Sequence, residues 1–348
     1  MNDRISLPGG PSVSQLWRQA GDLVASMQRP LVISHTRPDC DAYGSLIALR
    51  SILRALGRDP QILAFNPIPR TYSFLERFEF IPVWGRDAGS DALAGTDGVI
   101  ITDTCSYSQL EPLAEWLTST TAPKVAVDHH ATRDVPVDAA VIDDGAAAAC
   151  LLIHEWAKLM EWPVDDDAAR ALFLGIATDT GWFCHSNTDA RAFAAVAELT
   201  ARGIRPNEYH VMVLQSDTAA RVRLLGEALH SLELFCQERL AVMTLDAATF
   251  QRIDARTSET ENVINEPLRI RSVIVSVLLI EQPDGPVRVS FRSKAPIEGY
   301  VSADVDVSAI AARFGGGGHR RASGARIEGT LADVRRRVVE RVSEELED

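Results

Sequence analysis

The sequence predicts an α/β protein: a parallel sheet with helices on both faces, followed by a smaller α+β domain. The 348 residues are long for one hydrophobic core and suit two domains. Short apolar strands alternate with helical stretches in the first part, which is the pattern of a parallel sheet. After about residue 225 the pattern changes to strands separated by turn residues. We therefore expect domains at residues 1–215 and 236–348, joined by a linker helix at 216–235.

The elements of the first domain follow from its apolar runs. We expect strands at Leu31–Ser34, Gln61–Phe65, Gly98–Thr102 and Lys124–Val127. We expect helices at Ser14–Met27, Ala42–Leu56, Ala146–Met160, Asp166–Thr178 and Asp189–Arg202. In the second part we expect a helix around Thr218–Leu232 and strands at Leu240–Leu245, Val273–Glu281 and Val287–Ser290, with a PDG turn at residues 283–285.

Composition and charge exclude several classes of protein. The hydrophobic and charged fractions, 46% and 24%, are those of an ordinary globular protein. No apolar run approaches the ~20 residues that a membrane helix needs, and the first twelve residues lack the apolar core of a signal peptide. The five cysteines form no CxxC pair, which argues against a disulfide framework or a thiolate zinc site and favours the cytoplasm.

The net charge of −13 argues against broad binding of long nucleic acids. It leaves room for a small anionic substrate, because bound cations can invert the local field.

Four acidic or histidine motifs each follow a predicted strand or end a predicted helix. In open parallel sheets, ligands bind beyond the carboxyl ends of the strands, so these motifs can converge in one crevice. The residues concerned are His35, Asp39 and Asp41 after the first strand, Asp103 after GVIIT, the triplet Asp128, His129 and His130 after KVAV, and Asp179 at the end of the helix ARALFLGIAT.

Converging carboxylates repel one another and raise each other's pKa unless cations neutralise them. Mixed carboxylate and imidazole donors suit Mn²⁺, Fe²⁺, Co²⁺ or Zn²⁺ better than Ca²⁺. With this many donors, two divalent cations fit better than one, and such a pair supports in-line phosphoryl displacement. A lone aspartate at a strand end is usually a helix cap or turn former. Four such signals in order favour a metal centre instead.

Three details of these motifs carry further expectations. Asp39 and Asp41 are two residues apart, so in an extended segment both would point to the same side, and Cys40 would point away as a small buried thiol. Asp128 is expected to orient a histidine imidazole without contacting a cation itself, so it is not counted as a metal ligand. Arg133 could face a substrate phosphate or be a solvated loop arginine.

The second domain carries a glycine run followed by a histidine. Gly315–Gly318 and His319 could bring backbone N–H groups close to phosphate oxygens, but a flexible turn explains the glycines equally well. Upstream, an alternating strand from Val287 ends in Arg292, Ser293 and Lys294. Its alternative interpretation is a solvent-facing edge strand.

The segments HTRPDCDAYGS, ITDT, VDHH and ATDTGWF resemble, in order, the four motifs of the DHH phosphoesterases. RSK at 292–294 and GGGGH at 315–319 resemble the DHHA1 domain that often follows. The resemblance implies that His35, Asp39 and Asp103 hold one cation, that Asp41, Asp103, His129 and Asp179 hold the other, and that Asp103 bridges the two. Mn²⁺ is the family's usual metal. His130 would face the substrate phosphate and act with Asp103 in catalysis.

The resemblance also implies a nucleotide site between the domains. It would be formed by Arg292, Ser293, Gly316, Gly317, Gly318 and His319. The chain is similar to the nanoRNase/pAp-phosphatase type of this family, which implies hydrolysis of short oligoribonucleotides and dinucleotides, and 3′-dephosphorylation of adenosine 3′,5′-bisphosphate (pAp). One departure is Ala131-Thr132-Arg133, where many relatives have Ser-Asn after the triplet.

Two other functions stay open at this point. One is a cytosolic phosphodiesterase for linear or cyclic dinucleotides such as pGpG, c-di-AMP or c-di-GMP. The other is a nucleotide-binding regulator with a degenerate site, against which the presence of every expected ligand weighs. The oligomeric state is also open, with a homodimer as one arrangement.

Overall fold

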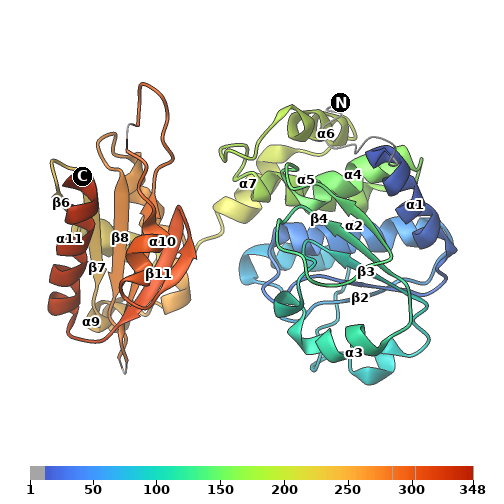
Figure 1. Ribbon diagram of the computed structural model, residues 1–348, viewed down its shortest axis with the longest axis horizontal. Helices are drawn as coiled ribbons and strands as arrows, with labels where there is room; N and C mark the ends of the chain where they lie inside the picture. The colour runs from blue at the N-terminus through green and yellow to red at the C-terminus, as the bar shows by residue number, and fades with distance from the viewer. Residues whose placement is uncertain (1–11, 284, 302, 348) are drawn as a thin grey trace. The chain divides into compact units, whose positions relative to one another are not determined.

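A five-stranded parallel sheet forms the centre of the first of two units (Figure 1). The computed structural model describes residues 12–283, 285–301 and 303–347. The chain divides into the units Met1–Ser216 and Asp217–Asp348. The first sheet has the order β2-β1-β3-β4-β5, with bounds β1 (Pro30–Ile33), β2 (Gln61–Leu63), β3 (Gly98–Thr102), β4 (Lys124–Asp128) and β5 (Ala139–Ile142).

The first four strands lie where the apolar runs predicted them. The prediction missed β5, because its sequence AAVI is short and half alanine, which is weak in strands.

Helices cover both faces of this sheet, which confirms the expected fold class. Val32, Ile100 and Val125 point to the face that packs against α1, α2 and α4, and α5 and α6 pack onto these helices in the same hydrophobic cluster. Leu31, Val99 and Ile101 point to the other face, which is covered by short segments around α3. The bounds are α1 (Val13–Ser26), α2 (Cys40–Ala55), α3 (Ala114–Ser119), α4 (Ala149–Leu159), α5 (Asp166–Asp179), α6 (Ala190–Thr200) and α7 (Pro206–Leu214), with 3₁₀ helices η1 (Arg70–Arg77), η2 (Ser90–Leu93), η3 (Tyr107–Gln109) and η4 (Glu111–Leu113).

Two glycines let α2 and α5 approach closely. A Cβ on Gly44 would lie 2.7 Å from the Ala171 carbonyl oxygen. A Cβ on Gly175 would lie 2.3 Å from Cys150 Sγ and 2.6 Å from Asp41 Oδ1. Larger side chains at these positions would push the helices apart, so the glycines keep the start of α2 near the end of α5.

The second unit contains a six-stranded mixed sheet of order β10-β11-β9-β8-β7-β6, in which β7 and β8 pair in parallel and the other described neighbours pair antiparallel. Its strands are β6 (Glu233–Phe235), β7 (Leu240–Leu245), β8 (Val275–Ile280), β9 (Val287–Ser293), β10 (Gly317–His319) and β11 (Ala322–Ile327). Its helices are α8 (Ala219–His230), α9 (Ala247–Ile253), α10 (Val307–Ala312) and α11 (Leu331–Glu347), with 3₁₀ helices η5 (Thr257–Thr260) and η6 (Val263–Arg269).

Strand β9 lies inside the second sheet, between β8 and β11, so the edge-strand interpretation of residues 287–294 is wrong. The predicted turn at 283–285 includes residue 284, which lies outside the described residues, as do the first eleven residues of the chain. Within the described part of the chain, no helix is both long and apolar enough to cross a membrane.

Candidate metal centre

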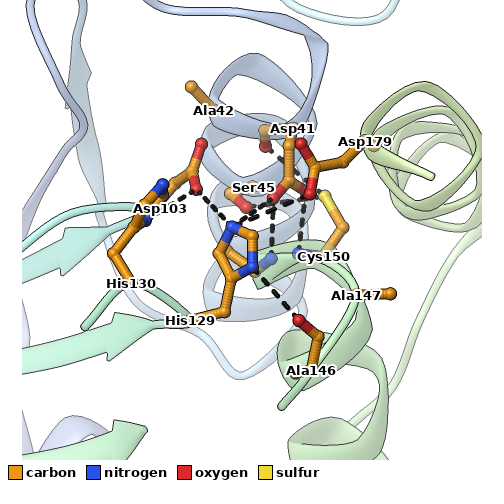
Figure 2. Close-up of polar contacts among 12 residues, drawn as sticks. Asp41, Ala42, Ser45, Asp103, His129, His130, Ala146, Ala147, Cys150 and Asp179 are labelled. Carbon is orange, nitrogen blue, oxygen red and sulfur yellow. Dashed lines mark hydrogen bonds and ion pairs between the residues drawn. The ribbon is translucent and has the colours of Figure 1, made fainter. Parts of the chain in front are cut away.

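The predicted ligands meet at the carboxyl edge of the parallel sheet. His35 follows β1, Asp103 directly follows β3, and His129 directly follows β4. These three strands are neighbours in the sheet, so their carboxyl ends share one edge. Asp179 is the last residue of α5. Figure 2 shows the side chains of Asp41, Asp103, His129 and Asp179 pointing toward one another.

Asp39 and Asp41 reach the site in a different way from the one predicted. Asp39 is the N-cap of α2, and its Oδ1 accepts hydrogen bonds from the backbone N–H groups of Asp41 (2.9 Å) and Ala42 (3.1 Å). Asp41 already lies in the first helical turn, so the argument from an extended segment is wrong. Cys40 is fully buried, as expected.

The structure gathers donor atoms into overlapping groups, and the atoms of each lie within 4.8 Å of one another. One group is His35, Asp39 and Asp103, and another is Asp41, His129 and Asp179. A third joins Asp103 to His129 and His130. The first group has the members of one ligand set that the resemblance implied, and the second group has those of the other set except Asp103.

Asp103 stands between the two groups. Its Oδ2 lies 3.3 Å from His35 Nε2, and its Oδ1 lies 3.3 Å from His129 Nε2. The side chain is 3% exposed, and the backbone has a φ of 59°, a left-handed conformation that aspartate tolerates better than most residues. Burial alone would raise the pKa of Asp103, but the hydrogen bonds with His129 and His35 outweigh it and hold the pKa below its ordinary value. One carboxylate therefore faces both groups.

His129 presents its Nε2 to the cluster. Its Nδ1 lies 3.2 Å from the carbonyl oxygen of Ala146, so Nδ1 carries the proton and donates it there. Burial lowers the pKa of His129, but the hydrogen bond to Asp103 and the charges of Asp41 and Asp179 raise it to about 10. In the absence of a cation, the surrounding carboxylates therefore attract a proton onto this imidazole.

Asp41 also caps a helix. Its Oδ2 accepts the backbone N–H of Ala149 at 2.7 Å, and its Oδ1 accepts that of Cys150 at 2.9 Å, at the start of α4 (Figure 2). Each carboxylate oxygen keeps a further lone pair for a cation. Burial, followed by the charge of Asp103, raises the pKa of Asp41 well above its ordinary value.

Asp179 lies before a tightly turned loop. Gly181, Trp182 and Phe183 all have positive φ values, of 55°, 54° and 67°. The side-chain amide of Asn187 donates to the carbonyl oxygens of Asp179 (3.1 Å) and Ala147 (3.0 Å), which ties the end of α5 to the segment before α4. Burial raises the pKa of Asp179 to about 6. Asn187 was not among the residues predicted from the sequence, although it lies in the loop that follows the proposed ligand Asp179.

His130 is held by Asp128. The fully buried Asp128 accepts the Nδ1–H of His130 at 2.8 Å and its backbone N–H at 3.1 Å, so it orients this imidazole as expected. The hydrogen bond to Asp128 raises the pKa of His130, and more than half of the His130 side chain remains exposed. Arg133 pairs with Asp144 and donates to the His130 carbonyl oxygen (2.9 Å). It braces the loop rather than standing free in solvent.

The donor set fits divalent cations. The carboxylates of Asp41 and Asp179 lie close to the His129 imidazole, and Asp103 lies beside them. Burial, together with the charge of Asp103, raises the pKa of both Asp41 and Asp179, so their ionised forms are unfavourable without added positive charge. Bound cations supply that charge, and carboxylate and imidazole donors are suited to them.

In the second unit, Arg292 and His319 share one face of the sheet. His319 on β10 pairs with Ala322, which pairs with Arg292, and directly opposed residues point to the same side. Burial lowers the pKa of Arg292, whose guanidinium donates to the Phe291 carbonyl oxygen and has no carboxylate partner among the described residues.

Ser293 points to the other face of the sheet. It is buried there, and its hydroxyl donates to the Val305 carbonyl oxygen at 2.9 Å. Its side chain therefore does not share the face that holds Arg292 and His319, and its part in a nucleotide site stays a prediction.

The glycine run is part of an ordered hairpin, so the flexible-turn interpretation is wrong. A Cβ on Gly316 would lie 2.1 Å from the Gly324 carbonyl oxygen. Gly318 has a φ of 139°, and a Cβ there would lie 2.6 Å from the Ala322 carbonyl oxygen. Packing thus requires glycine at both positions. At Gly317 a Cβ would meet nothing within 4 Å, so there the fold leaves open space.

A parallel α/β unit with a carboxylate and imidazole cluster, followed by a mixed-sheet unit with a glycine hairpin, defines a two-domain protein with a divalent-cation site. The sequence matches the family models described as "DHH family, N-terminal domain" over residues 29–176 and "DHHA1 domain" over residues 238–348. The chain belongs to the DHH/DHHA1 phosphoesterase family.

Relatives of similar length carry informative names. The chain is 26% identical over 296 residues to the "Bifunctional oligoribonuclease and PAP phosphatase NrnA" of Bacillus subtilis, covering 84% of this chain and 87% of that protein. It is 28% identical over 348 residues to the protein of the same name from Thermus thermophilus, covering 97% and 96%.

Solved structures share the fold. An exopolyphosphatase-related protein from Bacteroides fragilis aligns with a TM-score of 0.83 at 20% identity, over 96% of this chain and 98% of that one. The exonuclease RecJ bound to manganese aligns with a TM-score of 0.50 at 15% identity, over 95% and 94%. At these identities the likeness concerns the fold alone.

Proposed function

We propose that this protein uses two divalent cations to hydrolyse short oligoribonucleotides to mononucleotides and to remove the 3′-phosphate of pAp. The observation that carries the proposal is the pair of donor groups that face opposite oxygens of Asp103. The names of full-length relatives at 24–28% identity support the substrate class. We propose Mn²⁺ as the metal, because the donors suit it and the family commonly uses it.

In this proposal His35, Asp39 and Asp103 hold one cation, and Asp41, Asp103, His129 and Asp179 hold the other. Bound cations supply Lewis-acid stabilisation of the charge on the phosphoryl group and a nucleophile at neutral pH. The chain's part is to place them: the Asp103 carboxylate fixes both groups, and Ala146 holds the His129 ring with Nε2 toward the cluster.

His130 acts on the phosphate. With Nδ1 donating to Asp128 and its pKa raised by that bond, the imidazolium form carries its second proton on Nε2. From there it donates to a phosphate oxygen or to the departing oxygen. Arg292 and His319 grip the nucleotide portion, and a substrate phosphate provides the anionic partner that Arg292 lacks.

The proposed location is the cytoplasm. All five cysteines are free, and Cys40, Cys105 and Cys150 are buried, which suits a reducing compartment.

The test is an activity panel on the purified protein loaded with Mn²⁺. The substrates are 5′-phosphorylated RNA from two nucleotides upward, together with pAp, pGpG and cyclic dinucleotides. We expect turnover of pApA and pAp, with rates that fall beyond a few nucleotides. Turnover of cyclic dinucleotides alone would favour the phosphodiesterase alternative, and cation binding without turnover of any substrate would favour a regulator. Rapid degradation of long single strands would contradict the proposed length preference.

A further inference from the structure

Strands β9 and β11 have one buried face and one accessible face. Along β9, Val287, Val289, Phe291 and Ser293 are buried, and the residues between them are partly exposed. On β11 the buried positions are Ser323, Ala325 and Ile327. The buried faces pack against α10 and α11.

The accessible face is left open by the second unit's own helices. On the same side of the sheet, Leu278 and Ile280 of β8 are covered by a cluster that includes α8 and part of η6. Although η6 also contacts β9, the described residues of β9 and β11 on this side all keep partial or full exposure. An antiparallel half-sheet with one uncovered face is available for a ligand.

The register arranges this face in three rows. The first row holds His319, Ala322 and Arg292. The middle row holds Gly317, Gly324 and Ser290, which leave a low floor of small residues. The third row holds Arg326 directly opposite Arg288. Two basic rows thus lie on either side of a flat strip.

The third row is electrostatically unbalanced. Directly opposed like charges destabilise a sheet. Among the described residues, neither Arg288 nor Arg326 has an ion pair or side-chain hydrogen bond, whereas the neighbouring Arg320 and Arg321 both pair with Asp304. An anion bound between Arg288 and Arg326 would remove the repulsion and provide charge-assisted hydrogen bonds.

We infer that Arg288 and Arg326 form a second phosphate subsite for oligonucleotide substrates. The inference rests on the proposed function, in which Arg292 and His319 bind a first phosphate. Arg288 and Arg292 are four residues apart on one strand, which corresponds to about 13 Å. A single sugar linkage is too short for that span. The two rows therefore suit phosphates separated by an intervening one, as in the 5′-phosphorylated trinucleotide pApApA, and they exceed the reach of pApA and pAp.

The first experiment measures binding without catalysis. Fluorescently labelled pApApA and pApA are titrated into metal-free protein at several salt concentrations. Arg288→Ala/Arg326→Ala should weaken binding of pApApA roughly tenfold or more and reduce its salt slope by about 1.4, since each lost contact to a single strand contributes about 0.7. Arg288→Lys/Arg326→Lys should keep most of the salt slope. The control is Arg336→Ala on α11, which covers the opposite face; its arginine pairs with Asp333 and Glu340.

The second experiment compares turnover of the two substrates. In the double alanine variant, the ratio of kcat/KM for pApApA to that for pApA should fall about tenfold, and it should stay constant in Arg336→Ala. An unchanged ratio or an unchanged salt slope overturns the subsite. If the wild-type protein turns over neither substrate, the proposed function fails, and the binding experiment alone then decides whether the subsite exists.

Discussion

Replacing Asp179 by asparagine should stabilise the metal-free protein and at the same time reduce the stabilisation that divalent cations provide. Asp179 has a pKa raised from 3.8 to about 6, chiefly by burial. A raised pKa means that this carboxyl's contribution to stability is fully present below pH 3.8 and is lost as the pH rises through about 6. At pH 7.5 the wild-type protein has lost that contribution to its stability. The Asp179→Asn variant keeps it, because an amide does not ionise.

The magnitude follows from the same shift. A pKa raised from 3.8 to about 6 corresponds to at most roughly 3 kcal/mol at 1.36 kcal/mol for each pKa unit. Because the side chain is 26% exposed and its charge is coupled to its neighbours, we expect the substitution to raise the free energy of unfolding of the metal-free protein by about 1–2 kcal/mol. Cations at a hundredfold excess over their dissociation constant stabilise a native protein by about 2.7 kcal/mol. The variant should lose much of that response.

The assay is thermal unfolding, measured in EDTA and in Mn²⁺ between pH 5 and 8, and the transition compared is that of the first unit, which contains Asp179. In EDTA the variant should unfold at a higher temperature than wild type at pH 7.5, and the difference should shrink as the pH falls through 6. Asp166→Asn, at the other end of α5, is the matched control: its exposed carboxylate should leave the cation response unchanged. A variant that is destabilised in EDTA, or that keeps the full response to Mn²⁺, would refute the reasoning.

Three further predictions concern the shared carboxylate, the proposed nucleotide-binding residues and the loop after Asp179. Asp103→Asn should abolish turnover with the fold intact, because an amide cannot supply the charge shared by both groups; near-wild-type activity with added Mn²⁺ would contradict the two-cation assignment. Arg292→Ala should lower kcat/KM on pApA ten- to a hundredfold, since a charge-assisted contact is worth about 1.5–3 kcal/mol. The same variant should barely affect bis-p-nitrophenyl phosphate, and His319→Ala should behave alike; loss of metal in either variant would place the residue in the catalytic centre instead. Asn187→Ala should weaken cation affinity about ten- to a hundredfold in a calorimetric titration of metal-free protein, as loss of an outer-shell partner does; unchanged affinity would show that its two hydrogen bonds only hold the loop.

Much of the fold could be predicted because its strands are apolar runs with clear ends. The carboxyl ends of β1, β3 and β4 also located His35, Asp103 and His129, since an open parallel sheet places its functional groups there. The error over Asp39 has a physical cause: aspartate before a helix is a strong N-cap, and α2 starts one residue later. A reading of that capping signal would have replaced the extended segment with a helical turn.

Other features depend on registers and packing that no motif records. The row that joins His319 to Arg292 exists because β11 lies between β10 and β9, and that strand order is a tertiary property. Ser293, next to Arg292 in sequence, lies on the opposite face for a different reason. In a strand, adjacency in sequence means opposite sides of the sheet. If all residues of a motif in a strand are assigned to one side of the sheet, every second residue is placed on the wrong face.

The loop before α4 and the first residues of that helix organise the site mainly through backbone groups. Ala146 accepts from His129, Ala147 accepts from Asn187, and the N–H groups of Ala149 and Cys150 donate to Asp41. Alanine side chains contribute none of these bonds, but their small size lets α2 and α5 pack beside the segment.

The orientation of His129 and Asp41 is therefore determined by the path of the chain at residues 146–150, and the Asn187 side chain ties the end of α5 to the same segment. The donors of this group are therefore directed toward one point before any cation binds, and binding needs little reordering of side chains. The same arrangement explains why the ionised carboxylates are unfavourable in the metal-free protein: the fold buries them and also holds them close to one another.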